Sequence, residues 1–180
     1  MSMMIELRGE AGPALVVGGG AVATRKVRNL AEGEFRITVI APEMSEEIRT
    51  APFIRLEARP FADSDLPGDP RYALVFACTD DRETNRRVGE LARSCGIPVV
   101  VTDSQEESTF FTPATIRDGD LAIAVSTGGA SPTLAREIRE KIVAALGPGW
   151  ARVVALAREE RRKRLEARRA APTPTDESGE

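Results

Sequence analysis

Two features of the sequence carry residues suited to chemistry, a glycine-rich turn and an aspartate behind an apolar run. The turn is Gly18-x-Gly20-x-x-Ala23, between the apolar run 14–17 and a helical pattern. The first glycine allows a tight bend, the second lets the backbone approach a pyrophosphate, and a small third residue lets helix and strand pack closely. Free N–H groups at a helix start favour an anionic phosphate. A glycine run also occurs as a simple flexible turn, and the strand–turn–helix context is what favours a dinucleotide site.

Asp103 follows the apolar run Val99-Val100-Val101-Thr102. Ligands of open α/β sheets bind beyond the carboxyl ends of the strands, so this carboxylate is expected in the ligand crevice. The chain has no histidine, which excludes His-based triads, His-rich zinc sites and an imidazole base. Asp103 is therefore the leading candidate for a general base, and an Asp-Ser turn is the alternative.

Thr79-Asp80-Asp81 follows another strand-like run at residues 72–77. Helix capping explains Asp81, with Thr84 nearby. For Thr79 and Asp80, capping and a position along the cofactor crevice both remain open.

The residue that would bind the ribose is less defined. Glu43 is the nearest acid after the strand-like run 37–40, as a ribose ligand or as a solvated acid in the first turn of a helix. Arg36 precedes that strand, so no basic residue is placed for a 2′-phosphate, which favours NAD over NADP.

These motifs require strands and helices in alternation. Apolar runs predict buried strands at 14–17, 37–40, 53–56, 72–77 and 98–102, with helices after the first and fourth. Such repetition implies right-handed crossovers, so the fold class is α/β, a Rossmann-like doubly wound parallel sheet.

Beyond Asp103 the pattern changes to a small α+β segment and a C-terminal helical region. Short β-like runs are expected at 109–111, 115–117 and 121–125, and Ser131-Pro132 marks a helix start. The turn 126–132 is a second anion site or a well-capped helix. We expect a dinucleotide-binding domain at 1–103, a dimerisation and substrate segment at 104–149, a basic helix at 150–169 and a disordered tail at 170–180.

Composition narrows the class of protein. The 180 residues are 42% hydrophobic and 29% charged with net charge -3, typical of a globular protein. No apolar run reaches the ~20 residues of a membrane span, and the N-terminus does not read as a secretory signal. Cys78 and Cys95 read as reduced core thiols of a cytoplasmic protein. The basic segment 158–169 lacks interleaved aromatic residues, which favours a solvated or dimer-contact helix over nucleic-acid binding.

Five segments together resemble the precorrin-2 dehydrogenases, the N-terminal part of siroheme synthases. The similarity covers about residues 5 to 145 and rests on Val16 to Lys26, Ala77 to Asp81 with Asn85, Thr102-Asp103, Ser108 to Ala114 and Val125 to Pro132.

The resemblance implies oxidation of precorrin-2 to sirohydrochlorin with hydride passing to NAD, and in some members insertion of ferrous iron by the same site. It implies that Asp103 acts in proton removal and, in a chelatase, at the metal; no other metal ligand is expected. The cofactor residues it implies are Gly18, Gly20, Ala21, Val22, Pro42, Glu43, Thr79 and Asp80. Ser126, Thr127 and Gly128 would lie near the tetrapyrrole, with Arg136 and Arg139 as carboxylate clamps or surface ion-pair partners.

Two features qualify the resemblance. Val100 stands where relatives often carry Asn. No second catalytic domain is present, so a separate methyltransferase is expected to supply precorrin-2, and a homodimer is expected from the helical region. Three hypotheses follow: an NAD-dependent dehydrogenase, a bifunctional dehydrogenase and chelatase, and a non-catalytic NAD-sensing domain.

Overall fold

The structure is a computed structural model that describes residues 3–170. The chain divides into two compact units, Met1–Phe111 and Thr112–Glu180. The tail expected at 170–180 lies outside the described residues except for Ala170, with which the last helix ends.

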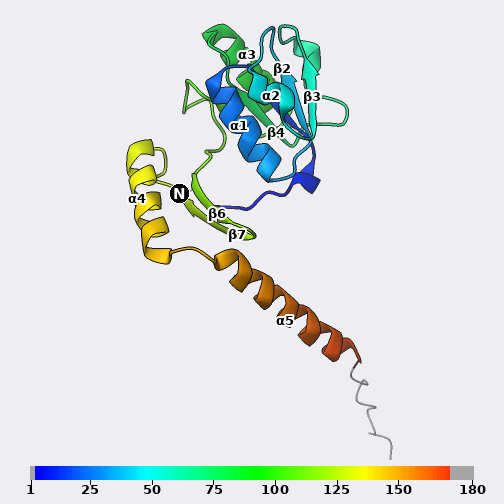
Figure 1. The fold of residues 1–180 in the computed structure, drawn as a ribbon. Coiled ribbons are helices and arrows are strands. Elements are labelled where there is room, and N and C mark those ends of the chain that lie inside the picture. Colours follow the sequence, from blue (N-terminus) through cyan, green and yellow to red (C-terminus); the bar gives the residue numbers. More distant parts are fainter. Residues whose placement is uncertain (1–2, 171–180) are drawn as a thin grey trace, which may run out of the picture. The chain divides into compact units, whose positions relative to one another are not determined.

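The first unit contains a five-stranded parallel sheet (Figure 1). Its order is β3-β2-β1-β4-β5, with parallel pairing throughout. β1 and β2 are buried along their whole length because helices cover both faces, which explains their continuous apolar sequences. This confirms the doubly wound Rossmann-like fold. The strands are β1 (Ala14–Val17), β2 (Ile37–Ile40), β3 (Ile54–Glu57), β4 (Leu74–Ala77) and β5 (Val99–Val101).

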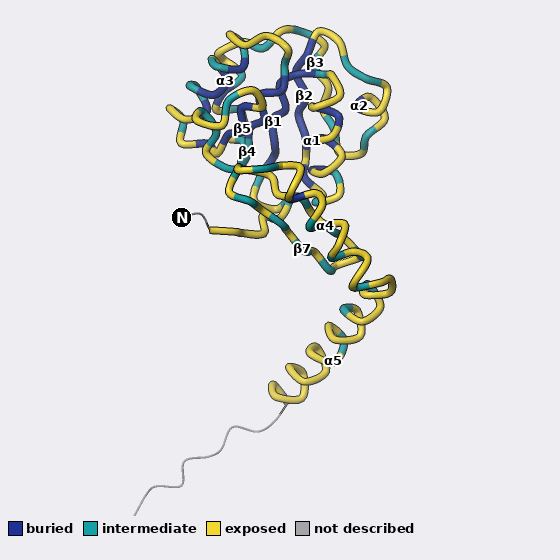
Figure 2. The backbone as a smooth tube through the Cα atoms, turned by 90° about the vertical axis from the view of Figure 1, so that its left-hand side faces the viewer, coloured by how far each residue is buried: buried dark blue, intermediate teal, exposed yellow. Residues whose placement is uncertain are grey.

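Three helices and two short 3-10 turns complete this unit. The helices are α1 (Ala21–Glu32), α2 (Glu46–Thr50) and α3 (Arg82–Ser94), and the 3-10 turns are η1 (Gly9–Ala11) and η2 (Asp63–Asp65). Alternate strand residues enter opposite halves of the core: Val16 packs with Val27 of α1, and Val17 with Val88 of α3. Figure 2 shows the buried strands in dark blue.

The β-like run expected at Thr109 to Phe111 is not a strand. Thr109 N donates to Val99 O at 2.8 Å, and Val99 N donates to the Thr109 hydroxyl oxygen at 2.8 Å. A side chain thus replaces the backbone partner of a regular ladder. Phe110 packs edge-on against Phe76 with ring centroids 5.6 Å apart, which draws the segment into the core instead of along the sheet.

The second unit holds an antiparallel hairpin and two helices. β6 (Ala114–Asp118) pairs with β7 (Leu121–Val125), followed by α4 (Pro132–Leu146) and α5 (Trp150–Ala170). Ser131 caps α4 by accepting from Leu134 N at 3.1 Å, with proline in the first turn, as the sequence predicts. None of the helices in the described part of the chain has the length and apolar character that crossing a membrane would require.

Candidate active site

Three strand ends meet around Gly18. Its N–H donates to Ile40 O at 2.9 Å, and a Cβ at this position would lie 2.4 Å from Cys78 O. The φ angle of +121° belongs to a region that L side chains rarely adopt. The ends of β1, β2 and β4 are therefore packed so closely that only glycine fits.

The loop after β2 is held against the same turn. A Cβ on Gly19 would lie 1.9 Å from Glu43 O, and Ser45 N donates to Gly19 O at 3.1 Å. Pro42 and Glu43 therefore border the glycine turn, and both are exposed. Glu43 is not a first-turn helix acid, because α2 begins at Glu46 with Ser45 as its cap. That alternative was wrong because a short loop separates the strand from its helix.

The first turn of α1 is open. Gly20 is its N-cap without a side-chain hydrogen bond, and no acidic residue lies in the first turn. The caps of α2, α3 and α4 are side chains, those of Ser45, Asp81 and Ser131. A Cβ on Gly20 would meet no atom within 4 Å. The uncapped N–H groups and the open space above them fit the diphosphate of a dinucleotide.

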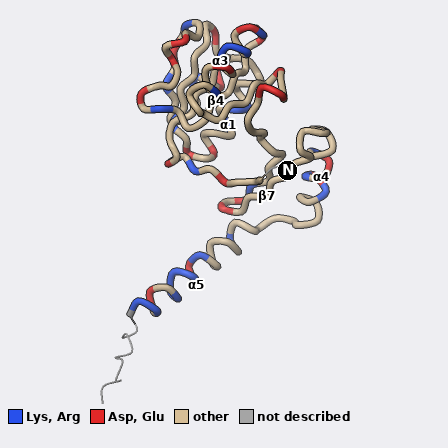
Figure 3. Tube along the Cα trace, turned by 180° about the vertical axis from the view of Figure 1, so that it is seen from behind, with Lys and Arg blue, Asp and Glu red and all other residues tan. Residues whose placement is uncertain are grey.

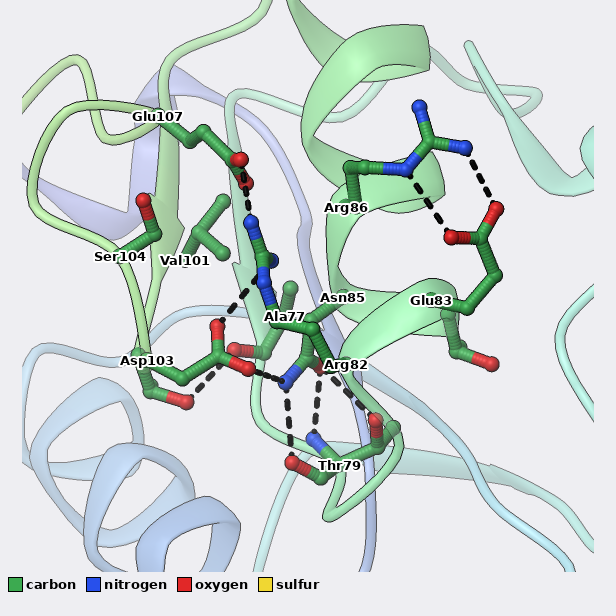
Figure 4. A network of polar contacts seen from close by, with 12 residues as sticks. Ala77, Thr79, Arg82, Glu83, Asn85, Arg86, Val101, Asp103, Ser104 and Glu107 are labelled. Atoms are coloured by element: carbon green, nitrogen blue, oxygen red, sulfur yellow. Dashed lines mark hydrogen bonds and ion pairs between the residues drawn. The ribbon is translucent and has the colours of Figure 1, made fainter.

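Asp103 lies just beyond β5, and Asn85 links it to the end of β4 (Figure 4). Asn85 Nδ2 donates to Asp103 Oδ2 at 3.0 Å and to Thr79 O at 3.0 Å. Thr79 N donates to Asn85 Oδ1 at 3.0 Å. The structure therefore brings the predicted residues Thr79 and Asp103 together, while Asp80 is exposed beside them.

Arg82 connects the two carboxylates of this edge. Its guanidinium lies 3.5 Å from Asp103 Oδ1 and hydrogen-bonds to Glu107. That hydrogen bond, with the charges of Glu107 and Asp103, raises the pKa of Arg82. Glu107 Oε2 is buried without a hydrogen-bond partner. The Asp103 side chain is 37% exposed, so solvent or a ligand reaches it.

A buried cation lies behind the turn. Lys26 of α1 is 7% exposed, with Nζ 5.5 Å from the centroid of the Phe76 ring. Burial lowers the pKa of Lys26, and burial raises the pKa of the Cys78 thiol to about 12. Cys78 is therefore a neutral core side chain rather than a nucleophile.

Asp81 has the capping role that the sequence predicts. Its carboxylate accepts from Thr84 N at 3.0 Å and from Glu83 N at 3.4 Å. The Thr84 side chain and backbone hydrogen bonds hold the pKa of Asp81 below its usual value.

The remaining candidates lie in the second unit, around the turn between β7 and α4. Ser126 Oγ accepts from Gly128 N at 3.2 Å. Thr127 Oγ1 accepts from Ser131 N at 3.0 Å and donates to Ser131 O at 3.1 Å, so its hydroxyl supports the turn. Arg136 is exposed on α4.

Basic residues follow one another along α5 with acidic residues among them (Figure 3). Ion pairs account for part of the charge in this unit. Arg139 lies 3.5 Å from Glu140. On α5, Arg162 lies 2.6 Å from Glu159, and Arg158 lies 2.6 Å from Asp120 of the β-hairpin. The basic helix thus makes intrachain pairs on its solvated surface.

Sequence reasoning assigned no role to Asn85 or Arg82. Asn85 is fully buried and Arg82 opens α3, and only the folded chain brings them to Asp103. Among residues 3–170, no three histidine, cysteine, aspartate or glutamate side chains gather as metal ligands would.

Family comparisons agree with this geometry. Residues 3–114, more than half of the chain, match the family described as "Putative NAD(P)-binding". Residues 118–145 match the family "Sirohaem biosynthesis protein central". The chain belongs to the precorrin-2 dehydrogenase and siroheme synthase N-terminal domain family. The resemblance expected from the sequence is confirmed.

Individual members of the family show how far the similarity extends. The chain is 41% identical over 154 residues to the siroheme synthase of Gluconacetobacter diazotrophicus, covering 82% of this chain and 32% of that protein. It is 44% identical over 131 residues to the siroheme synthase of Ectopseudomonas mendocina, covering 72% of this chain and 28% of that protein. The chain thus spans about a third of the length of these curated relatives.

A solved structure has a similar fold and a more similar length. It is that of SirC, a precorrin-2 dehydrogenase, with a TM-score of 0.69 and 27% sequence identity. The match covers 88% of this chain and 77% of SirC.

Proposed function

We propose that this protein oxidises precorrin-2 to sirohydrochlorin with NAD as hydride acceptor, and that Asp103 is its acid–base residue. One observation carries the proposal. The partly exposed carboxylate of Asp103 lies at the same sheet edge as the uncapped start of α1, joined to the β4 end by Asn85. A phosphate-binding helix start and a carboxylate base at one edge are what a hydride-removing enzyme requires.

The binding roles follow from the geometry of the turn. Gly18 lets the strand end bend, while Gly20, Ala21 and Val22 present exposed backbone at the helix start. Pro42 and Glu43 border the adenosine end. Glu46 and Glu47 follow in the first turn of α2, and Glu47 is paired with Arg28 at 2.5 Å. The carboxylates of Glu43 and Glu46 disfavour a 2′-phosphate, which favours NAD over NADP.

The oxidation removes two hydrogens from the tetrapyrrole, one as hydride and one as a proton. NAD, which Gly18, Gly20, Ala21 and Val22 would hold at the start of α1, would supply the hydride acceptor. Asp103 accepts the proton from the neighbouring ring position and releases it to solvent. Thr79 and Asp80 border the same crevice, where they orient the reacting face. The chain has no histidine that could act as the base. Among the carboxylates described at this site, Asp103 is the one that is both exposed and hydrogen-bonded to a buried side chain, that of Asn85.

The domains have separate roles in this proposal. Residues 1–103 bind the cofactor, while 104–149 provide the substrate segment, with Ser126, Thr127, Gly128 and Arg136 toward the tetrapyrrole and its carboxylates. The apolar side chains exposed on α4 and α5 support a homodimer with a second copy of the chain: Leu134, Val143, Val153 and Leu156. A separate methyltransferase would supply precorrin-2. Cytoplasm, where Cys78 and Cys95 stay reduced, is the proposed location.

Iron insertion is the second candidate function. It is supported by the family's siroheme synthases and by the partly exposed carboxylate of Asp103, which can accept pyrrole protons and hold ferrous iron as a substrate. Iron insertion that is faster than the uncatalysed reaction and lost in Asp103→Ala would establish it.

The test is anaerobic incubation with enzymatically made precorrin-2 and NAD, following NADH and the tetrapyrrole spectrum together. We expect one NADH for each sirohydrochlorin formed. Asp103→Ala should lower turnover by about a hundredfold or more while NAD still binds. Full activity in that variant would remove Asp103 from the mechanism. NAD binding without turnover in the wild type would favour the NAD-sensing alternative.

A further inference from the structure

Asn85 is the most completely buried polar side chain beside the candidate active site. It lies in the first turn of α3 and is 0% exposed. A buried amide costs free energy unless its hydrogen bonds are made. Its partners therefore show what the fold uses it for, and they lie on two different strand ends (Figure 4).

Three of its contacts are to one residue. Thr79 N donates to Asn85 Oδ1 at 3.0 Å, and the Thr79 hydroxyl lies 2.8 Å from the same oxygen. Asn85 Nδ2 donates one proton to Thr79 O at 3.0 Å. Because the Thr79 N–H requires an acceptor, these contacts fix which end of the amide is oxygen.

The fourth contact lies across the sheet edge. With the oxygen committed to Thr79, the second Nδ2 proton points to Asp103 Oδ2 at 3.0 Å. The other carboxylate oxygen is 3.5 Å from Arg82, whose guanidinium also binds Glu107. Of the two contacts to this carboxylate, the one from Asn85 is thus the shorter, and Asn85 is the more buried of the two partners.

We propose that Asn85 is a positioning residue for Asp103, which fixes the base relative to the Thr79 loop of the cofactor crevice. The inference rests on the proposed function. A rigid amide between the two strand ends holds the carboxylate at a set distance from whatever Thr79 binds. Misplacement of a reacting group by about 1 Å can cost about a hundredfold in rate.

Two variants separate this role from a purely structural one. Asn85→Asp keeps an oxygen to accept from Thr79 but turns a second carboxylate oxygen toward Asp103 in place of both Nδ2 donations. Asn85→Ala loses all four contacts without adding a charge. A positioning role predicts that both lower kcat by about tenfold to a hundredfold, because both lose the Asp103 contact. It also predicts that the Asn85→Asp Kd for NAD stays within about threefold of wild type.

A purely structural role predicts a parallel loss. Stability, NAD affinity and kcat would then fall together in each variant. The control is Val88→Ala, which removes two buried methyl groups from the same helix and no contact to Thr79 or Asp103. It should lower the melting temperature and leave kcat unchanged. A parallel loss of stability, NAD affinity and kcat, or an Asn85→Ala kcat within about twofold of wild type, would overturn the inference.

A measurement without substrate keeps the two proposals apart. In the amide NMR spectrum of the full chain, Asp103→Ala should shift one Asn85 Nδ2 proton upfield and leave the proton bonded to Thr79 O in place. If neither proton moves, the positioning contact is absent and the inference fails. If the proton moves but wild-type protein never reduces NAD, the contact is real, the proposed function fails, and Asn85 has no base to position.

Discussion

Replacing Gly20 by alanine separates folding from cofactor binding. Gly20 has φ -84° and ψ -168°, angles that any L residue adopts. A Cβ there meets no atom within 4 Å. We therefore expect the free energy of unfolding to change by at most about 1 kcal/mol, the order of a change at a helix N-cap.

The methyl group of Gly20→Ala would occupy the space in which we expect the cofactor phosphate to bind. The start of α1 has no side-chain cap, so its N–H groups are free to bind an anion. Each hydrogen bond to a charged group contributes about 1.5–3 kcal/mol. Since about 1.4 kcal/mol is tenfold in Kd, losing one such bond should weaken NAD binding by about tenfold to a hundredfold.

The assay combines calorimetric titration of NAD with thermal unfolding, and Gly18→Ala is the matched control. Gly18 has φ +121°, and its Cβ would lie 2.4 Å from Cys78 O, so this variant should lose stability as well as binding. The reasoning is refuted if Gly20→Ala binds NAD as tightly as wild type, or if it unfolds as readily as Gly18→Ala.

Three further predictions concern stability and reactivity. In native protein, an alkylating reagent should modify Cys95 and leave Cys78 unmodified, because burial keeps the Cys78 thiol neutral and inaccessible. Mass spectrometry before and after denaturation checks this prediction. Labelling of Cys78 in the native protein would contradict it. Burial lowers the pKa of Lys26 in the folded protein. Between that lowered pKa and the ordinary lysine pKa, the unfolded chain binds more protons than the folded chain. The free energy of unfolding should therefore rise with pH over this range. Urea titrations across this range should show a weaker rise for Lys26→Met than for wild type, and equal slopes would argue against the buried cation. Ser131→Ala removes the acceptor for Leu134 N and should cost about 1 kcal/mol; denaturant unfolding that shows no loss would mean the cap contributes nothing.

Local sequence determined most of the elements. The apolar run at Ala14–Val17 predicts a buried strand because no polar side chain interrupts it, and β1 has these bounds. Asp81 and the Ser131-Pro132 pair predict the starts of α3 and α4, since short polar side chains cap free N–H groups without tertiary help. The glycine turn likewise follows from chemistry within a few residues.

Other features could not be predicted because they depend on distant partners. α2 is only five residues long, and its cap Ser45 is also 2.8 Å from the Thr24 hydroxyl of α1. Thr109 looked like a strand residue, yet its hydroxyl bonds to Val99 and Phe110 turns toward Phe76. The conformation of these segments is set by long-range packing, which overrides local propensity.

The sequence by itself determined the α/β fold and indicated the proposed phosphate turn and Asp103 as the candidate base, since each depends on residue type and short spacing. Only the tertiary structure decided which side chains surround Asp103. Seventeen residues separate Asn85 from Asp103 in the chain. Asn85 lies in α3 after β4, Asp103 follows β5, and the parallel pairing of these strands brings Asn85 Nδ2 to 3.0 Å from Asp103 Oδ2. A hydrogen bond of that kind forms when strand ends meet at one edge, and no local pattern encodes the meeting.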